Sequence, residues 1–264
     1  MIPEFIPFTA AFLFGSIVGS FLNVCIFRLP DGESVVFPGS HCRACKKLIA
    51  WYDNIPLFSY VFLRGQCRHC HAHISRQYFL IELTAAFLFV LFYHIFGATL
   101  VGGIYLVFSL ALLVEAVIDL RHQIIPDEIT LPGIILGLLL SGLIPSLQGQ
   151  ENWMNGLGAS FLGALAGGGF LFAAGFLAEK IMKKEAMGGG DVKLMAMIGA
   201  FLGWPGVLWT IFVSSVLGSA AGLYLRFKKG EQYIPYGPYL ALAAFMYLFY
   251  GKAFVQWYLA FLGL

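Results

Sequence analysis

Residues 83–114 read LTAAFLFVLFYHIFGATLVGGIYLVFSLALLV, and this stretch contains no Asp, Glu, Lys or Arg. A helix needs about 20 apolar residues to cross the hydrocarbon core of a bilayer, so the stretch is longer than one crossing. Gly97-Ala98 lies near its middle, and glycine commonly marks a turn between helices. The stretch therefore predicts two transmembrane helices joined by a short turn.

The rest of the chain has the same character. Only 11% of the 264 residues are charged and 59% are hydrophobic, whereas soluble domains carry about 25% charged residues. This composition excludes a cytosolic enzyme, a secreted domain and a disordered scaffold, and it indicates the lipid bilayer rather than a nucleic acid as partner. Membrane β-barrels need alternating apolar and polar residues, which the continuous runs lack. The predicted fold class is an all-α polytopic membrane protein.

About eight spans are expected. They cover residues 6–28, 78–96, 99–118, 129–147, 157–180, 190–203, 206–225 and 236–262. The sixth span is short, so a complete crossing draws Asp191 and Lys193 into the membrane edge. Ionisable residues are costly there and usually have a partner or a function. A re-entrant hairpin is the alternative for this span.

The basic residues indicate the orientation. Fifteen of the sixteen Lys and Arg residues fall on one side of the predicted membrane, which the positive-inside rule makes cytoplasmic. The N-terminus is then outside, and the first apolar run is expected to be a retained helix because no basic n-region precedes it. Three domains are predicted: a first transmembrane helix at 1–28, a cytoplasmic domain at 29–77 and a transmembrane domain at 78–264.

A cysteine pattern marks the cytoplasmic domain. Two CxxC pairs supply four thiols, those of Cys42, Cys45, Cys67 and Cys70. Four thiolates suit a closed tetrahedral zinc site, and a loop of this size needs such a clip to fold. A pair of disulfides is the alternative, which a reducing compartment disfavours. The nearby histidines are further candidate ligands, whereas Cys25 is expected to be a buried apolar residue.

Two acidic segments stand at cytoplasmic helix ends. Asp119 follows the third span and Asp191 opens the sixth. Two neighbouring carboxylates can share one proton, so that one acts as acid while the other activates water. Gly188, Gly189 and Gly190 would let a substrate backbone approach Asp191, in conformations closed to other residues. The alternative is that both carboxylates are simply solvated helix ends.

The chain resembles the bacterial prepilin leader peptidases over nearly its whole length. The resemblance rests on motifs in the family's order: Gly19–Val24 with Arg28-Leu29-Pro30, the two CxxC pairs flanking Asn54-Ile55-Pro56 and Ser59-Tyr60, Ile118-Asp119 with Ile125-Pro126-Asp127, the GxGD stretch Gly188–Asp191 followed by Lys193-Leu194, and Pro235–Tyr239. By motif position, the family's catalytic pair falls on Asp119 and Asp191.

The resemblance implies a bifunctional enzyme of the bacterial inner membrane. It implies cleavage of a short basic leader from type IV prepilins and pseudopilins, followed by methylation of the new N-terminal amine with S-adenosylmethionine. Assembly proteins of a pilus or type II secretion system are further implied partners. The residues of the methyl-donor site are unknown at this stage. Asp127 and Glu128 are candidates to hold the basic leader.

Two other functions remain open from the sequence. One is a GxGD intramembrane protease of the presenilin or signal-peptide-peptidase type, which shares the second aspartate motif. The other is a non-enzymatic membrane assembly factor or transporter that uses the zinc-clipped loop for docking. The two aspartates discriminate between these functions, because only a protease requires them.

Overall fold

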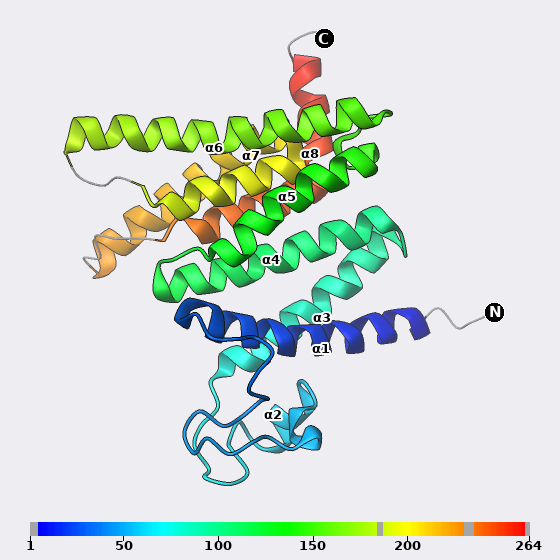
Figure 1. The fold of residues 1–264 in the computed structure, drawn as a ribbon, viewed down its shortest axis with the longest axis vertical. Coiled ribbons are helices and arrows are strands. Elements are labelled where there is room, and N and C mark those ends of the chain that lie inside the picture. The colour runs from blue at the N-terminus through cyan, green and yellow to red at the C-terminus, as the bar shows by residue number, and fades with distance from the viewer. Residues whose placement is uncertain (1–4, 184–186, 230–234, 262–264) are drawn as a thin grey trace. The chain divides into compact units, whose positions relative to one another are not determined.

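The computed structural model describes residues 5–183, 187–229 and 235–261, and this part of the chain is almost entirely helical (Figure 1). The long helices are α1 (Phe5–Arg28), α3 (Arg76–Phe96), α4 (Leu100–His122), α5 (Asp127–Leu143), α6 (Trp153–Met182), α7 (Gly189–Lys229) and α8 (Gly237–Phe261). The short ones are η1 (Leu29–Asp31), η2 (Trp51–Asn54), α2 (Phe58–Phe62) and η3 (Pro145–Gln148). The predicted all-α class is confirmed.

Five helices have the length and hydropathy of a membrane span: Phe5–Asp31, Arg76–Phe96, Leu100–His122, Trp153–Ile181 and Gly189–Leu225. The multi-pass character is thereby confirmed. α5 has only 17 residues, and the apolar part of α8 covers Gly237–Gly251. The count of eight spans stays a prediction, and residues 1–4 and 262, which the predicted boundaries include, lie outside the described residues.

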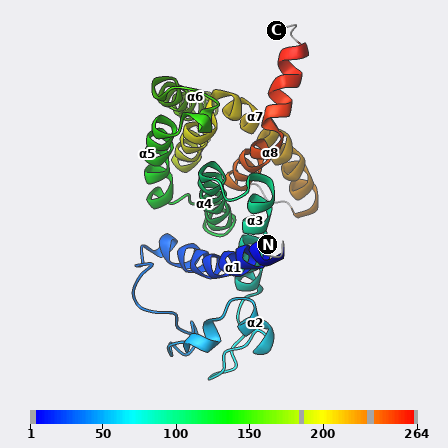
Figure 2. The same cartoon turned by 90° about the vertical axis from the view of Figure 1, so that its right-hand side faces the viewer.

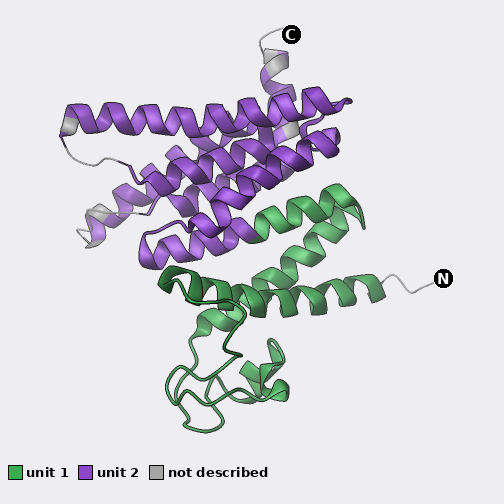
Figure 3. Cartoon of the chain, in the orientation of Figure 1, with its two compact units in different colours: residues 1–110 green, residues 111–264 purple. Residues whose placement is uncertain are grey.

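The chain divides into two compact units, residues 1–110 and 111–264 (Figure 3). The first unit holds α1, α3, the loop between them and the start of α4. The second holds the end of α4 and the helices α5 to α8. Residues 29–77, expected to form a domain of their own, belong to the first unit together with their flanking helices.

In the first unit, α1 packs closely along α3. Gly15 lies against the backbone of Ala86, and Gly19 lies against the backbone of Glu82. Small residues let membrane helices approach so closely that main-chain atoms touch. Farther along, the Asn23 amide donates a hydrogen bond of 3.0 Å to the Tyr78 carbonyl. These contacts hold Glu82 beside the middle of α1.

In the second unit, α6 packs along α7, and α5 packs against both (Figures 1 and 2). Gly163 and Gly199 meet at the crossing, where neither position has room for a side chain. Glycine at both positions therefore serves the close packing of the two helices. α8 packs on α7 as well, so α7 is the central helix of this unit.

The predicted break between the sixth and seventh spans falls inside α7, which consists of two helical segments that meet at Gly203. Gly203 has φ 67° and ψ −179°, and Pro205 follows. Proline cannot donate to the carbonyl four residues earlier, which is that of Phe201. The Gln148 amide donates to this carbonyl at 3.2 Å and to that of Ala200 at 2.9 Å. The side chain of Gln148 therefore satisfies carbonyls at the end of the first segment, where the break removes their helical partners.

Candidate active site and metal centre

Asp119 lies in the last turn of α4 and is almost completely buried, with 6% of its surface exposed. Its Oδ2 accepts a hydrogen bond of 2.9 Å from the backbone N–H of Gly237. Gly237 is the first residue of α8, where the N–H groups have no partner within the helix. The start of α8 thus holds one oxygen of this carboxylate, which leaves Oδ1 for a water or a substrate.

Asp191 lies in the first turn of α7 and is half-buried. It is close enough to Asp119 for the two negative charges to repel each other. The structure therefore brings together the two acids that the sequence singled out, although 71 residues separate them along the chain. Paired carboxylates of this kind favour a state with one shared proton.

Ile125 packs against two glycines, one beside each acid: Gly190, which precedes Asp191, and Gly237, which donates to Asp119. It lies in the loop between α4 and α5, and a side chain at Gly190 would meet its Cβ at 2.9 Å. A side chain at Gly237 would reach its Cδ1 at 3.3 Å and Asp119 Oδ2 at 2.7 Å. Glycine at both positions therefore lets the start of α7 and the start of α8 close around the same loop.

The three glycines before Asp191 differ from one another. Gly188 precedes α7, where a side chain would lie 3.6 Å from Asp191 Oδ2, and Gly189 faces open space. None of the three has a positive φ, so the expectation of a backbone conformation closed to other residues is wrong. Glycine is required here for close approach at Gly190. At Gly189 the space beside the backbone is open.

Other acids surround this pair. Glu115, one turn before Asp119, is fully buried, and neither carboxylate oxygen has a hydrogen-bond partner among the described residues. Asp127 forms an ion pair with Lys193 at 2.7 Å and 2.8 Å, so its charge is already compensated. Glu128 is exposed and has no such partner in the described chain.

The four predicted metal ligands come together in the first unit. The Sγ atoms of Cys42, Cys45, Cys67 and Cys70 all lie within 4.8 Å of one another. The two CxxC loops have matching geometry: each is closed by one β-bridge, His41 with Leu48 and Gln66 with His73. The Cys42 and Cys70 sulfurs are 3.8 Å apart, which equals the edge of about 3.8 Å in a tetrahedron with 2.3 Å zinc–sulfur bonds. The thiols fit a zinc ion, and no histidine of the described chain joins the cluster.

The electrostatics of the cluster favour a bound cation. The backbone N–H of Cys45 lowers the pKa of the Cys42 thiol to about 6. The backbone N–H of Ala72 lowers the pKa of Cys70, but burial and the neighbouring thiols outweigh it and raise that pKa to about 11. Four thiols at this spacing cannot all ionise unless a cation offsets their charge. A divalent ion would supply that charge.

Two positions of the acidic site, Gly237 and Ile125, could not be recognised as site residues from the sequence. Gly237 belongs to the motif Pro235–Tyr239, which enters the sequence only as part of the family resemblance. Ile125 was quoted only as part of a motif. The one available signal is glycine followed by proline at the start of a helix, because that helix end offers a free N–H to an acid.

These observations define a multi-pass helical membrane protein with a paired-carboxylate site and a four-cysteine cluster. Residues 13–96 match the bacterial peptidase A24 N-terminal domain, and residues 106–223 match the type IV leader peptidase family. The chain belongs to this family. Membership supports an enzyme over the assembly factor or transporter that the sequence left open.

Several curated relatives match the chain over most of its length. One from Stutzerimonas stutzeri is 37% identical and covers 95% of this chain and 93% of its own. Those from Xanthomonas campestris pv. campestris and Pseudomonas aeruginosa are both 36% identical, over 97% and 95% of this chain and 96% and 93% of their own. All three are named prepilin leader peptidase/N-methyltransferase. No solved structure matches the chain significantly.

Proposed function

We propose that this protein removes the leader peptide from type IV prepilins and pseudopilins and then methylates the new N-terminal amine. The support is membership of the leader peptidase family together with full-length relatives that carry both activities in their names. The observation that carries the peptidase half is the meeting of Asp119 and Asp191 at one end of the second unit.

The proposed cleavage uses Asp119 and Asp191 as an acid–base pair. One carboxylate takes a proton from a water, whose oxygen attacks the scissile carbonyl carbon. The other, protonated, stabilises the developing oxyanion, and the C–N bond then breaks as the departing amine receives a proton. The Gly237 N–H holds Asp119 in position for this role. In this proposal Gly188, Gly189 and Gly190 form the surface along which the substrate backbone lies.

Residues 29–77 are proposed to be a zinc-clipped cytoplasmic domain. The four thiols of Cys42, Cys45, Cys67 and Cys70 would hold the ion, and their spacing suits it. Four sulfurs close the coordination shell, so the ion has a structural role. The loop has almost no regular secondary structure, and metal binding would supply part of its folding free energy.

The methyltransferase half requires S-adenosylmethionine as methyl donor. When bound, it supplies an electrophilic methyl carbon: a new C–N bond forms to the neutral amine, the C–S bond breaks with its electron pair going to sulfur, and the amine proton passes to water. The chain's task is to hold the donor and to present a deprotonated amine. The twofold name of the relatives supports this assignment.

The proposed location is the bacterial inner membrane, with residues 29–77 in the cytoplasm and the N-terminus outside. The supporting observation is the concentration of Lys and Arg on one side of the spans. In this orientation the two aspartates lie at the cytoplasmic face, where a precursor with a basic leader stays. Pilus or type II secretion assembly proteins are proposed as further partners.

The test uses detergent-purified full-length protein, a pilin precursor and mass spectrometry with and without S-adenosylmethionine. We expect Asp119→Asn and Asp191→Asn each to lower cleavage about a thousandfold or more, because a catalytic pair acts as a unit. Glu151→Gln is the control, since Glu151 is an exposed acid before α6 and belongs to neither aspartate motif. A methyl-sized mass gain on the mature pilin, seen only with the donor, tests the second activity.

Two results would contradict the proposal. Cleavage that survives both substitutions would remove these aspartates from the mechanism. A folded native protein that cleaves no precursor would remove the peptidase function itself.

A further inference from the structure

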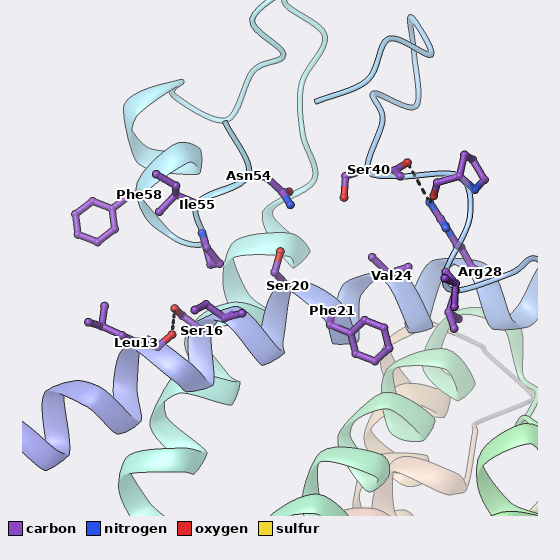
Figure 4. A pocket seen from close by; sticks show the side chains of 16 residues that line it. Leu13, Ser16, Ser20, Phe21, Val24, Arg28, Ser40, Asn54, Ile55 and Phe58 are labelled. Atoms are coloured by element: carbon purple, nitrogen blue, oxygen red, sulfur yellow. Dashed lines mark hydrogen bonds between the residues drawn. The ribbon is translucent and has the colours of Figure 1, made fainter. Parts of the chain in front are cut away.

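A cavity of about 610 Å³ lies in the first unit between α1 and the loop segment of residues 35–58 (Figure 4). Small-molecule and cofactor sites typically occupy about 300–1,000 Å³. The α1 residues that line it extend from Leu13 to Arg28, so the cavity is elongated along the helix. Its walls contain neither the aspartate pair nor the four cysteines.

One end of the cavity is cationic. Arg28 closes α1 and keeps only 8% of its surface exposed. Its guanidinium donates hydrogen bonds to the carbonyls of Ser34 at 2.9 Å and Pro38 at 2.8 Å. No carboxylate pairs with it among the residues that the structure describes. A buried cation without a counter-charge favours an anionic group, and a carboxylate fits the planar fork of arginine.

The middle of the cavity is polar. Ser20 from α1 and Asn54 from the loop point toward one another across it (Figure 4). Asn54 is exposed and forms no side-chain hydrogen bond within the described part of the chain. Glu82 interacts with the Ser20 side chain and accepts a hydrogen bond of 2.8 Å from the Leu57 N–H. A ligand here would find a hydroxyl and a free amide, with the buried Glu82 carboxyl behind the hydroxyl.

The other end of the cavity is apolar. Leu13 and Ile17 line it from α1, and Ile55 and Phe58 line it from the loop. Such side chains suit the flat face of an aromatic ring system and offer it no competing hydrogen bonds. From Ile17 to Arg28 the distance along the helix is about 16 Å at 1.5 Å per residue.

We propose that this cavity is the methyl-donor site and takes S-adenosylmethionine, an inference that rests on the proposed methyltransferase function. Arg28 would hold the donor's carboxylate, Ser20 and Asn54 its ribose hydroxyls, and the wall around Ile55 and Phe58 its adenine. Glu82 lies behind Ser20 and interacts with its side chain. The cavity thus offers a cationic end, a polar middle and an apolar end, in the order of the donor's carboxylate, ribose and adenine.

A phospholipid fits less well. Its phosphate would suit Arg28, but its acyl chain would then lie against Ser20 and Asn54. Polar groups covered by hydrocarbon lose their hydrogen bonds to water without replacement, which costs free energy. The donor instead presents hydroxyl and amine groups at this level.

The site also accounts for motifs that cleavage does not use. Gly19–Val24, Arg28-Leu29-Pro30 and Asn54-Ile55-Pro56 carry the resemblance to the leader peptidases, and they contribute Ser20, Arg28 and Asn54 to the cavity wall. Glu82 is a positioning residue here, because its bond to Leu57 fixes the segment that faces α1.

The test measures donor binding rather than turnover. Full-length protein in lipid nanodiscs, without pilin, is equilibrated with radiolabelled S-adenosylmethionine, and a photoreactive adenosine analogue is crosslinked and mapped by peptide mass spectrometry. The variants are Phe58→Ala and Asn54→Ala, with Phe62→Ala as control. Phe58 and Phe62 belong to the same short helix and are 69% and 80% exposed, but only Phe58 lines the cavity. Zinc content verifies that each variant is folded.

We expect Phe58→Ala to weaken binding about tenfold, the usual effect of losing one aromatic contact to a base. Asn54→Ala should weaken it severalfold, Phe62→Ala should not, and crosslinks should fall within residues 13–58.

Equal binding by all four proteins, or crosslinks elsewhere, would overturn the assignment and leave the methyltransferase function intact. A native protein that cleaves precursor but binds no donor would overturn both. A phospholipid retained by the native protein, lost in Phe58→Ala and not displaced by excess donor would identify a lipid site instead.

Discussion

The backbone N–H of Gly237 donates a hydrogen bond of 2.9 Å to Asp119 Oδ2, across 118 positions of the sequence. This bond ties the start of α8 to the end of α4. It fixes one oxygen of a carboxylate that is otherwise buried among apolar helices. The position of the proposed catalytic acid therefore depends on a residue with no side chain of its own.

The first prediction concerns this glycine. A methyl group at position 237 would lie 2.7 Å from Asp119 Oδ2, so Gly237→Ala must displace the carboxylate or the start of α8. We expect cleavage of a pilin precursor to fall about a hundredfold, because a displacement of about 1 Å costs that much in a preorganised site. Gly169→Ala is the control, since nothing lies within 4 Å of a side chain there. Equal cleavage rates for the two variants would contradict this prediction.

The second prediction concerns the cysteine cluster. Cys42→Ser removes one of four thiols whose sulfurs lie within 4.8 Å of one another. We expect zinc, measured by mass spectrometry of the metal, to fall from about one ion per chain to less than about a tenth. Limited proteolysis within residues 29–77 should accelerate at the same time. Cys25→Ala, in α1, should keep its zinc, and unchanged zinc in Cys42→Ser would exclude a four-cysteine site.

The third prediction concerns the kink of α7. The Gln148 amide donates to the carbonyls of Ala200 and Phe201 beside the break at Gly203, and the Ser160 hydroxyl shares the Ala200 carbonyl at 2.6 Å. We expect Gln148→Ala to lower the free energy of unfolding by about 1–3 kcal/mol, the cost of unsatisfied buried polar groups. Thermal unfolding in detergent measures this effect. Gln150→Ala, two residues away, is the control, and equal melting temperatures for both variants would argue against the role of Gln148.

The fourth prediction concerns the basic leader. Glu128 is exposed in the first turn of α5, whereas the neighbouring Asp127 is engaged by Lys193. We expect Glu128→Lys to slow cleavage of a precursor with a basic leader by about fivefold at low ionic strength, the scale of an exposed ion pair. The difference should shrink as salt screens the charges. Glu151→Lys, at the N-terminal side of α6, should have no such effect, and the same salt dependence in both variants would refute leader binding by Glu128.

Much of this architecture could be predicted because the bilayer imposes a strong constraint. Every backbone polar group must be satisfied inside the hydrocarbon, so long uncharged runs must be helices. The helical segments fall where these runs predict them. The break at Gly203 to Gly206 was predicted as a turn because glycine and proline usually end a helix. The structure has a break in α7 there, and Gln148 hydrogen-bonds the carbonyls beside it, a contact between segments that no local rule reveals.

The sequence alone identified the paired CxxC loops and the two acidic motifs, because each depends on residue types at short spacing. Only the tertiary structure decided which backbone groups complete the sites. Gly237 reaches Asp119 because α8 returns to α4, and Leu57 reaches Glu82 because the loop folds back over α1. Residue type and spacing determine what a side chain can do, but the packing of helices distant in sequence determines what it meets.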